Sequence, residues 1–131
     1  MSIYLDTSAL AKLIVAEDES EPLRAWLGER RGVPLITNSI GAVELHRLAA
    51  RVSQQASSAA VLLLARIDLL SLTPGALAAA AHLPPPEVRT LDALHVASAA
   101  ELGDLEALVT YDGRMQAAAT GYGLPVVSPT A

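Results

Sequence analysis

The chain has 131 residues, of which 52% are hydrophobic and only 3% aromatic, and its formal net charge of −5 comes from 14 acidic and 9 basic side chains. This size and composition predict one domain, residues 1–131, with a hydrophobic core of its own, and they argue against disorder. The absence of cysteine excludes disulfides and thiolate metal sites. The scarcity of aromatic residues excludes a base-stacking platform, and the acidic charge is atypical of a general nucleic-acid binder.

Short apolar runs alternate along the chain with segments of helical periodicity, which predicts strands that alternate with helices. The predicted strands cover residues 2–5, 34–37, 69–72, 107–110 and 124–127. The predicted helices cover about 7–16, 20–32, 39–53, 56–64, 75–82, 90–103 and 113–119. This alternation is typical of a parallel sheet covered on both faces, so the predicted fold class is α/β, a three-layer α/β/α sandwich.

Polar residues predict where several of these helices begin. Asp6 or Thr7 can cap the first helix, and Ser39 and Thr90 are the expected N-caps of two later helices. Three consecutive prolines at 84–86 exclude a helix there, because proline lacks the N–H that a helix interior requires.

Two segments bear on where the protein acts. The N-terminal residues carry no basic segment before their apolar run, which is unlike a signal peptide. The apolar stretch 56–72 is interrupted by Arg66, Asp68 and three serines, and is too polar for a membrane span. We therefore expect a soluble, cytoplasmic protein that makes no membrane contact.

Four acidic residues lie beside or within apolar segments, where a solvated surface would not place them: Asp6, Glu44, Asp92 and Asp112. Asp6 and Asp112 follow predicted strands, and the carboxyl ends of parallel strands share one rim of the sheet. Glu44 and Asp92 lie near the starts of predicted helices. A carboxylate in apolar surroundings is costly unless something positive neutralises it, and no lysine is nearby. We therefore expect the four acids to share one divalent-cation site.

Clustered carboxylates suit Mg²⁺ and Mn²⁺, which are hard ions that prefer oxygen ligands. Such ions activate water as a nucleophile and stabilise the departing oxygen of a phosphodiester. The same four acids are therefore the candidate catalytic and metal-binding residues. Without metal their charges repel one another, so the pKa of at least one of them is expected to rise.

Each acid also has a purely structural interpretation. Asp6 can be an N-cap, worth about 0.5–2 kcal/mol, and Glu44 can pair with Arg47 one turn away. Asp92 can complement a helix dipole, and Asp112 can be a plain turn residue. None of these interpretations explains why all four acids stand at comparable element ends.

The polar neighbours of the acids have two interpretations as well. Four hydroxyl side chains can orient the carboxylates or bind metal-bound water, or can simply cap and turn the chain: Thr7, Ser8, Ser39 and Thr110. His95, three residues after Asp92, is either a transition-metal ligand or a satisfied, partly buried histidine. Three arginines can hold phosphate or merely balance charge: Arg47, Arg89 and Arg114.

Four passages of the chain each contain one of the acids: residues 4–10 (Tyr-Leu-Asp-Thr-Ser-Ala-Leu), 39–47, 89–97 (Arg-Thr-Leu-Asp-Ala-Leu-His-Val-Ala) and 109–115. Together with residues 121–126 they resemble, in order and spacing, the PIN-domain nucleases and in particular the VapC-type toxins of bacterial toxin–antitoxin pairs. Any one passage is a weak signal, but the set is specific and spans nearly the whole chain.

The resemblance implies a PIN-like sandwich and Mg²⁺- or Mn²⁺-dependent cleavage of RNA. Asp6 and Asp92 match the principal metal-binding aspartates of the family, whereas Glu44 and Asp112 match its remaining acids. Thr110 matches a hydroxyl position beside the last acid. The target, whether transfer, ribosomal or messenger RNA, is left open, because the same acids would serve for each.

The resemblance also implies partners. A toxin of this type is held inactive by a small VapB-like antitoxin, which often presents an arginine to the acids, and family members commonly form homodimers. The acidic charge of the chain favours a basic inhibitor segment. Some relatives carry a further acid where this chain has Arg114, which leaves the strength of a second metal site open.

Two other functions remain as alternatives. A phosphotransfer module also places an aspartate after its first strand, but the phosphatase type requires a second aspartate where this chain has Ser8, and the receiver type requires a late lysine, whereas no lysine follows Lys12. A non-catalytic PIN-like binding module is the second alternative.

Overall fold

A computed structural model describes all residues, 1–131. Its sheet has five parallel strands in the order β3-β2-β1-β4-β5. The strands are β1 (Ser2–Leu5), β2 (Leu35–Asn38), β3 (Asp68–Leu70), β4 (Leu105–Val109) and β5 (Val126–Val127). The helices are α1 (Thr7–Lys12), α2 (Ser20–Gly28), α3 (Ser39–Val52), α4 (Gln54–Leu64), α5 (Pro74–Ala81), α6 (Thr90–Ala100) and α7 (Gly113–Gly121).

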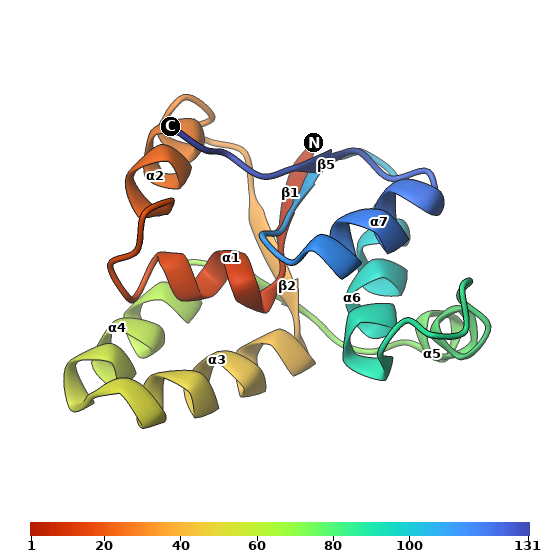
Figure 1. The fold of residues 1–131 in the computed structure, drawn as a ribbon, viewed down its shortest axis with the longest axis horizontal. Helices are drawn as coiled ribbons and strands as arrows, with labels where there is room; N and C mark the ends of the chain where they lie inside the picture. Colours follow the sequence, from red (N-terminus) through yellow and green to blue (C-terminus); the bar gives the residue numbers. More distant parts are fainter.

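The helices form one layer on each side of the sheet. Figure 1 shows α1 to α4 on one face and α5 to α7 on the other. The central strand β1 faces both layers, because successive side chains of a strand point in opposite directions. Ile3 and Leu5 join the core under α1 to α4, whereas Tyr4 joins the core under α6 and α7. The predicted α/β/α sandwich is therefore confirmed.

The strand order reverses direction at β1, which pairs with β2 on one side and with β4 on the other. In an open parallel sheet such a switch point leaves a crevice beyond the carboxyl ends of the strands, because the connections leave in opposite directions. The first acid, Asp6, directly follows β1 and therefore lies at this crevice.

The first two helices end about four residues earlier than predicted. The first ends at Lys12 rather than near residue 16, and the second ends at Gly28 rather than near Gly32. The chain after α1 turns early because the Ser20 hydroxyl donates to the Val15 carbonyl and accepts from the Glu17 N–H, which satisfies backbone groups that a longer helix would use. A side chain in the following turn thus fixes an end of α1 that helical periodicity does not reveal.

Two predicted N-caps are wrong by one residue. Asn38, not Ser39, caps α3, since its side chain accepts from the N–H of Gly41 at 2.8 Å. The N-cap of α6 is Arg89, without a side-chain hydrogen bond, and Thr90 is the first residue of the helix. The remaining predicted elements are present, although α6 stops at Ala100 instead of 103. No helix has the length and apolarity that crossing a membrane requires.

Candidate active site

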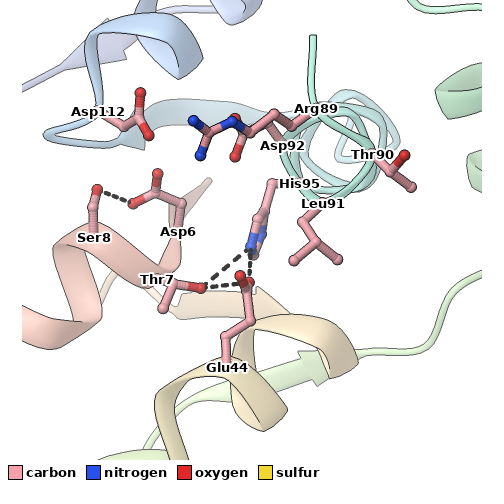
Figure 2. Close-up of a pocket in the computed structure, with 10 residues that line it drawn as sticks. All are labelled: Asp6, Thr7, Ser8, Glu44, Arg89, Thr90, Leu91, Asp92, His95 and Asp112. Atoms are coloured by element: carbon pink, nitrogen blue, oxygen red, sulfur yellow. Dashed lines mark hydrogen bonds and ion pairs between the residues drawn. The ribbon is translucent and has the colours of Figure 1, made fainter. Parts of the chain in front are cut away.

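A hollow of about 300 Å³ lies at the switch point and contains all four predicted acids (Figure 2). Its walls come from the N-terminal end of α1, from α3, from α6 and its N-cap, and from the loop between β4 and α7. Its lining residues are Asp6, Thr7, Ser8, Glu44, Arg89, Thr90, Leu91, Asp92, His95 and Asp112. Side chains up to 106 positions apart in the sequence therefore meet in one place, which we call the carboxylate pocket.

Asp6 is the most constrained of the four acids. It is only 2% exposed, and its Oδ1 accepts hydrogen bonds from the Ser8 hydroxyl at 2.6 Å and from the Ala9 N–H at 3.0 Å. Its Oδ2 accepts from the Thr110 hydroxyl at 2.5 Å. Burial raises the pKa of Asp6, although these three hydrogen bonds favour its ionised form and oppose that rise.

The hydroxyl groups of Ser8 and Thr110, which donate to Asp6, also accept hydrogen bonds from the loop after β4. Ser8 Oγ accepts from the Tyr111 N–H at 2.9 Å, and Thr110 Oγ1 accepts from the Asp112 N–H at 3.1 Å. Asp112 in turn caps α7, because its Oδ1 accepts from the N–H of Arg114 at 2.8 Å. The first and fourth acids are thus held in register by a network of short hydrogen bonds.

Glu44 projects from α3 toward α6 and α1. Its Oε1 accepts from Thr7 Oγ1 at 2.7 Å and lies 2.9 Å from His95 Nε2. Burial alone would raise the pKa of Glu44, but the hydrogen bonds from His95 and Thr7 outweigh it, and the pKa is lowered. The alternative pairing with Arg47 is not found, since that arginine makes no ion pair.

His95 links Glu44 to the sheet. Its side chain is 2% exposed, and its Nδ1 lies 2.7 Å from the Tyr4 hydroxyl. When Tyr4 donates to Nδ1, the imidazole carries its proton on Nε2 and donates it to Glu44. Because both ring nitrogens are already engaged, the histidine matches the interpretation of a satisfied, buried residue better than that of a transition-metal ligand.

Asp92 shows the electrostatic cost of the arrangement. It lies in the first turn of α6, and its carboxylate makes no hydrogen bond or ion pair within the protein. Burial raises the pKa of Asp92, and the negative charges of Asp112 and Asp6 add to the rise. The expected rise of at least one pKa in the metal-free pocket is therefore found, and its causes include two of the other acids.

The sequence profile of the PIN domain matches residues 3–121. The chain belongs to the PIN-domain family.

Known relatives cover nearly the whole chain. Ribonuclease VapC35 of Mycobacterium tuberculosis is 43% identical over 130 residues, which make up 97% of this chain and 96% of the relative. The crystal structure of VapC20 from the same organism, described as a sarcin-ricin loop cleaving toxin, matches with a TM-score of 0.76 at 20% identity, covering 98% of this chain and 100% of that one. VapBC2 of Rickettsia felis, bound to a DNA fragment from its promoter, matches with a TM-score of 0.77 at 16% identity, covering 98% and 99%.

The donor set of this PIN domain suits an ion that prefers oxygen ligands. Glu44 Oε2, Asp112 Oδ2 and both oxygens of Asp92 make no hydrogen bond within the protein and are available as ligands. No three acidic or histidine side chains converge closely enough to enclose an ion by themselves. Such an open arrangement fits Mg²⁺, which keeps several waters and takes one or two carboxylates directly.

The predicted hydroxyl neighbours divide into two groups. Thr7, Ser8 and Thr110 each donate a hydrogen bond to one of the four carboxylates. Ser39 does not line the carboxylate pocket, and its hydroxyl donates instead to the carbonyl of Leu70 on β3.

The sequence analysis did not identify Tyr4 as a residue of the site, because no local pattern indicates that a tyrosine in a strand contacts a histidine 91 positions away.

Proposed function

We propose that this PIN domain is a divalent-metal-dependent endoribonuclease that acts as the toxin of a toxin–antitoxin pair. The observation that carries the proposal is the meeting of four carboxylates, from four separate segments, in one pocket of this fold. The ribonuclease name of a relative that is 43% identical over nearly the full length supports the same activity. No finding favours the non-catalytic alternative.

The four acids would hold Mg²⁺, for which Mn²⁺ can substitute. The ion, when bound, supplies the positive charge that activates water and stabilises the charge developing on the phosphate. The protein's own contribution is preorganisation, since Asp6 is fixed by three donors and Glu44 by two. Thr7, Ser8 and Thr110 therefore orient the carboxylates before any substrate arrives.

The lowered pKa of Glu44 keeps this carboxylate ionised at neutral pH. An ionised Glu44 can serve as a ligand or accept a proton from attacking water. His95 and Thr7 hold its Oε1, and Oε2, which makes no hydrogen bond, is the oxygen that can act. Glu44 and the two residues that bind its Oε1, His95 and Thr7, therefore act together.

A small VapB-like antitoxin is the proposed partner. The neighbouring structures include VapBC assemblies, and a basic side chain would be attracted to the carboxylate pocket. Four large apolar side chains on α3 and α4 are more than half exposed and could contribute to contacts with a partner: Val43, Val52, Val61 and Leu62. We propose that the 131 residues act as one unit and that the chain forms a homodimer.

Replacement of Asp6 by asparagine tests the activity. Asparagine is as good an N-cap as aspartate, so α1 should persist, while RNA cleavage should fall by at least about 10²-fold because one preorganised charged group is lost. The measurement is cleavage of total RNA with Mg²⁺ or Mn²⁺ present, and Asp68→Asn, on the exposed edge strand β3, is the matched control. Full activity of Asp6→Asn in a preparation free of other nucleases would refute the proposal.

A further inference from the structure

Much of the positive charge of this chain has no acidic partner. Of the nine lysines and arginines, only Lys12, Arg24 and Arg30 form ion pairs with acidic side chains. The other six are exposed arginines without an acidic oxygen within ion-pair distance: Arg31, Arg47, Arg51, Arg66, Arg89 and Arg114. In a chain with a net charge of −5, with acids in excess, unpaired arginines call for an explanation.

Two of these arginines lie on one side of the carboxylate pocket. Arg47 and Arg51 are one helical turn apart on α3, and both line a hollow next to the carboxylate pocket. The two cavities share Thr7, Glu44 and Leu91 as lining residues, so they lie side by side. This first arginine pair also borders a second, shallower hollow farther along α3.

Two more of the unpaired arginines, Arg89 and Arg114, lie on the opposite side of the carboxylate pocket. Arg89, at the N-cap of α6, lines the carboxylate pocket itself and extends over it between Asp92 and Asp112 (Figure 2). Arg89 and Arg114, near the start of α7, together line the hollow beyond it. The acid Glu87 lines this hollow too but pairs with neither arginine.

The chemistry of the pocket restricts what these pairs can bind. A polyanion is repelled by four carboxylates, so it needs cations beside the pocket to approach them. None of these hollows is lined by a tyrosine or tryptophan, and His46 is the one exposed aromatic side chain beside the arginines, so we expect phosphate contacts rather than base stacking to supply most of the affinity. Arginine is suited to this task, because its planar fork binds phosphate oxygens in pairs.

We propose that an RNA strand crosses the carboxylate pocket and that its phosphates are held on either side by two arginine pairs, Arg47–Arg51 on α3 and Arg89–Arg114 at the starts of α6 and α7. The assignment rests on the proposed ribonuclease function and adds the path of the substrate to it. The scissile phosphate then lies between the two pairs, over the carboxylates, and the bound strand runs from the α3 side to the α7 side.

Salt dependence of binding tests this path directly. The probe is a labelled RNA that the wild-type chain cuts, bound by Asp6→Asn without added divalent cation, so that the RNA stays intact and only monovalent salt competes for its phosphates. Each phosphate contact in a single strand contributes about 0.7 to the slope of log affinity against log salt. Arg47→Ala/Arg51→Ala and Arg89→Ala/Arg114→Ala are therefore each expected to weaken binding and to reduce that slope by about 1.4.

The chain offers a matched control for these variants. Arg31→Ala/Arg66→Ala removes the same charge from two exposed, unpaired arginines that line neither the carboxylate pocket nor the hollows beside it. This control variant should bind the RNA with nearly the same affinity, and the same dependence of affinity on salt, as the Asp6→Asn protein in which it is made. In the active background, Arg47→Ala/Arg51→Ala should raise KM for the RNA far more than it lowers kcat, because this pair lines only the neighbouring hollows and binds the strand away from the reacting atoms.

The outcomes separate this inference from the function on which it rests. If the wild-type chain cuts no RNA, the proposed function fails first. If it cuts RNA, but the flanking variants bind with the same affinity and slope as Arg31→Ala/Arg66→Ala, the path is wrong. It is equally wrong if the flanking variants lose only salt-sensitive binding of a protein partner while RNA binding is unchanged, since the arginines then serve an acidic protein segment.

Discussion

At the scale of single residues, structural and functional interpretations of the same side chain prove compatible. Asp6 caps α1 through the N–H of Ala9, as its structural interpretation predicted. The same carboxylate also lies at the centre of the carboxylate pocket and receives the hydroxyls of Ser8 and Thr110. Asp112 likewise caps α7 with one oxygen and leaves the other unbonded. A cap is therefore no evidence against a site residue.

The link from Tyr4 through His95 to Glu44 leads to a prediction at this scale. Tyr4→Phe keeps the ring packing but removes the hydroxyl 2.7 Å from Nδ1, so the imidazole is no longer held in the form that donates to Glu44. We expect kcat for RNA cleavage to fall by up to about tenfold, because the loss of a direct partner of a ligand costs about 10–100-fold and Tyr4 acts on Glu44 one contact farther away, through His95.

A double-mutant cycle separates positioning from packing. If Tyr4 acts through Glu44, Tyr4→Phe should have no further effect on kcat in the Glu44→Gln background, since the charge that it orients is already gone. An equal loss of kcat in both backgrounds would contradict the link and assign Tyr4 to the core alone.

His95 shows where sequence reasoning reaches its limit at this scale. Its spacing from Asp92 placed it near the acids, and this much the structure supports. Its partners, however, come from β1, α1 and α3, which lie far away in the sequence. Local spacing can show that a residue is close to a site, but the contacts that determine its role depend on the assembled fold.

At the scale of elements, a glycine sets how closely α3 approaches the sheet and α6. A Cβ added at Gly41 would lie 2.4 Å from Thr37 Oγ1 and 3.2 Å from His95 Cε1. Gly41→Ala must therefore displace α3 or the histidine, and Glu44 lies one turn farther along the same helix. We expect a loss of about 1–3 kcal/mol in the free energy of unfolding, typical of overpacking, together with reduced RNA cleavage.

Denaturant unfolding measures the effect of Gly41→Ala, and Gly28→Ala is its control. A Cβ at Gly28, the last residue of α2, meets no atom within 4 Å, so this variant should be as stable as the wild type or slightly more so. Equal stability of the two variants would show that the approach of α3 is not limited by Gly41.

Sequence patterns predicted the kind and order of the elements much better than their ends. Alternating apolar runs and helical periods predicted every strand, because the inner strands of a parallel sheet are buried on both faces and mostly apolar, although the edge strand β3 is largely exposed. Helix ends were predicted less accurately. The Ser20 hydroxyl binds the Val15 carbonyl in the turn after α1, and Asn38, rather than the predicted Ser39, is the N-cap of α3. These contacts depend on where the chain goes next.

At the scale of the whole molecule, the fold brings together charges that destabilise it. The carboxyl ends of β1 and β4 place Asp6 and Asp112 on the same rim, and α3 and α6 add Glu44 and Asp92. The sequence predicted this meeting from element ends and from a family resemblance. It could not predict that the acids stay too far apart to enclose an ion unaided, because such distances depend on how the helices pack.

The repulsion between Asp92 and the other acids predicts how the thermal stability of the metal-free protein depends on pH. Because burial and Asp112 raise the pKa of Asp92, its contribution to stability is present below the unfolded pKa of about 3.9 and is lost as the pH rises through the folded value. At neutral pH, metal-free Asp92→Asn should therefore have a higher Tm than the wild type. The difference should shrink as the pH falls toward about 4, and a difference that does not change with pH would contradict this origin.

Titration with Mn²⁺, followed by thermal unfolding, tests the central claim that the four carboxylates form one cation site. Selective binding to the folded state raises Tm in a saturable manner. We predict such a rise for the wild type and for Asp68→Asn, and little or none for Asp6→Asn and Asp92→Asn. A wild type that Mn²⁺ does not stabilise, or an equal rise in all four proteins, would contradict the account.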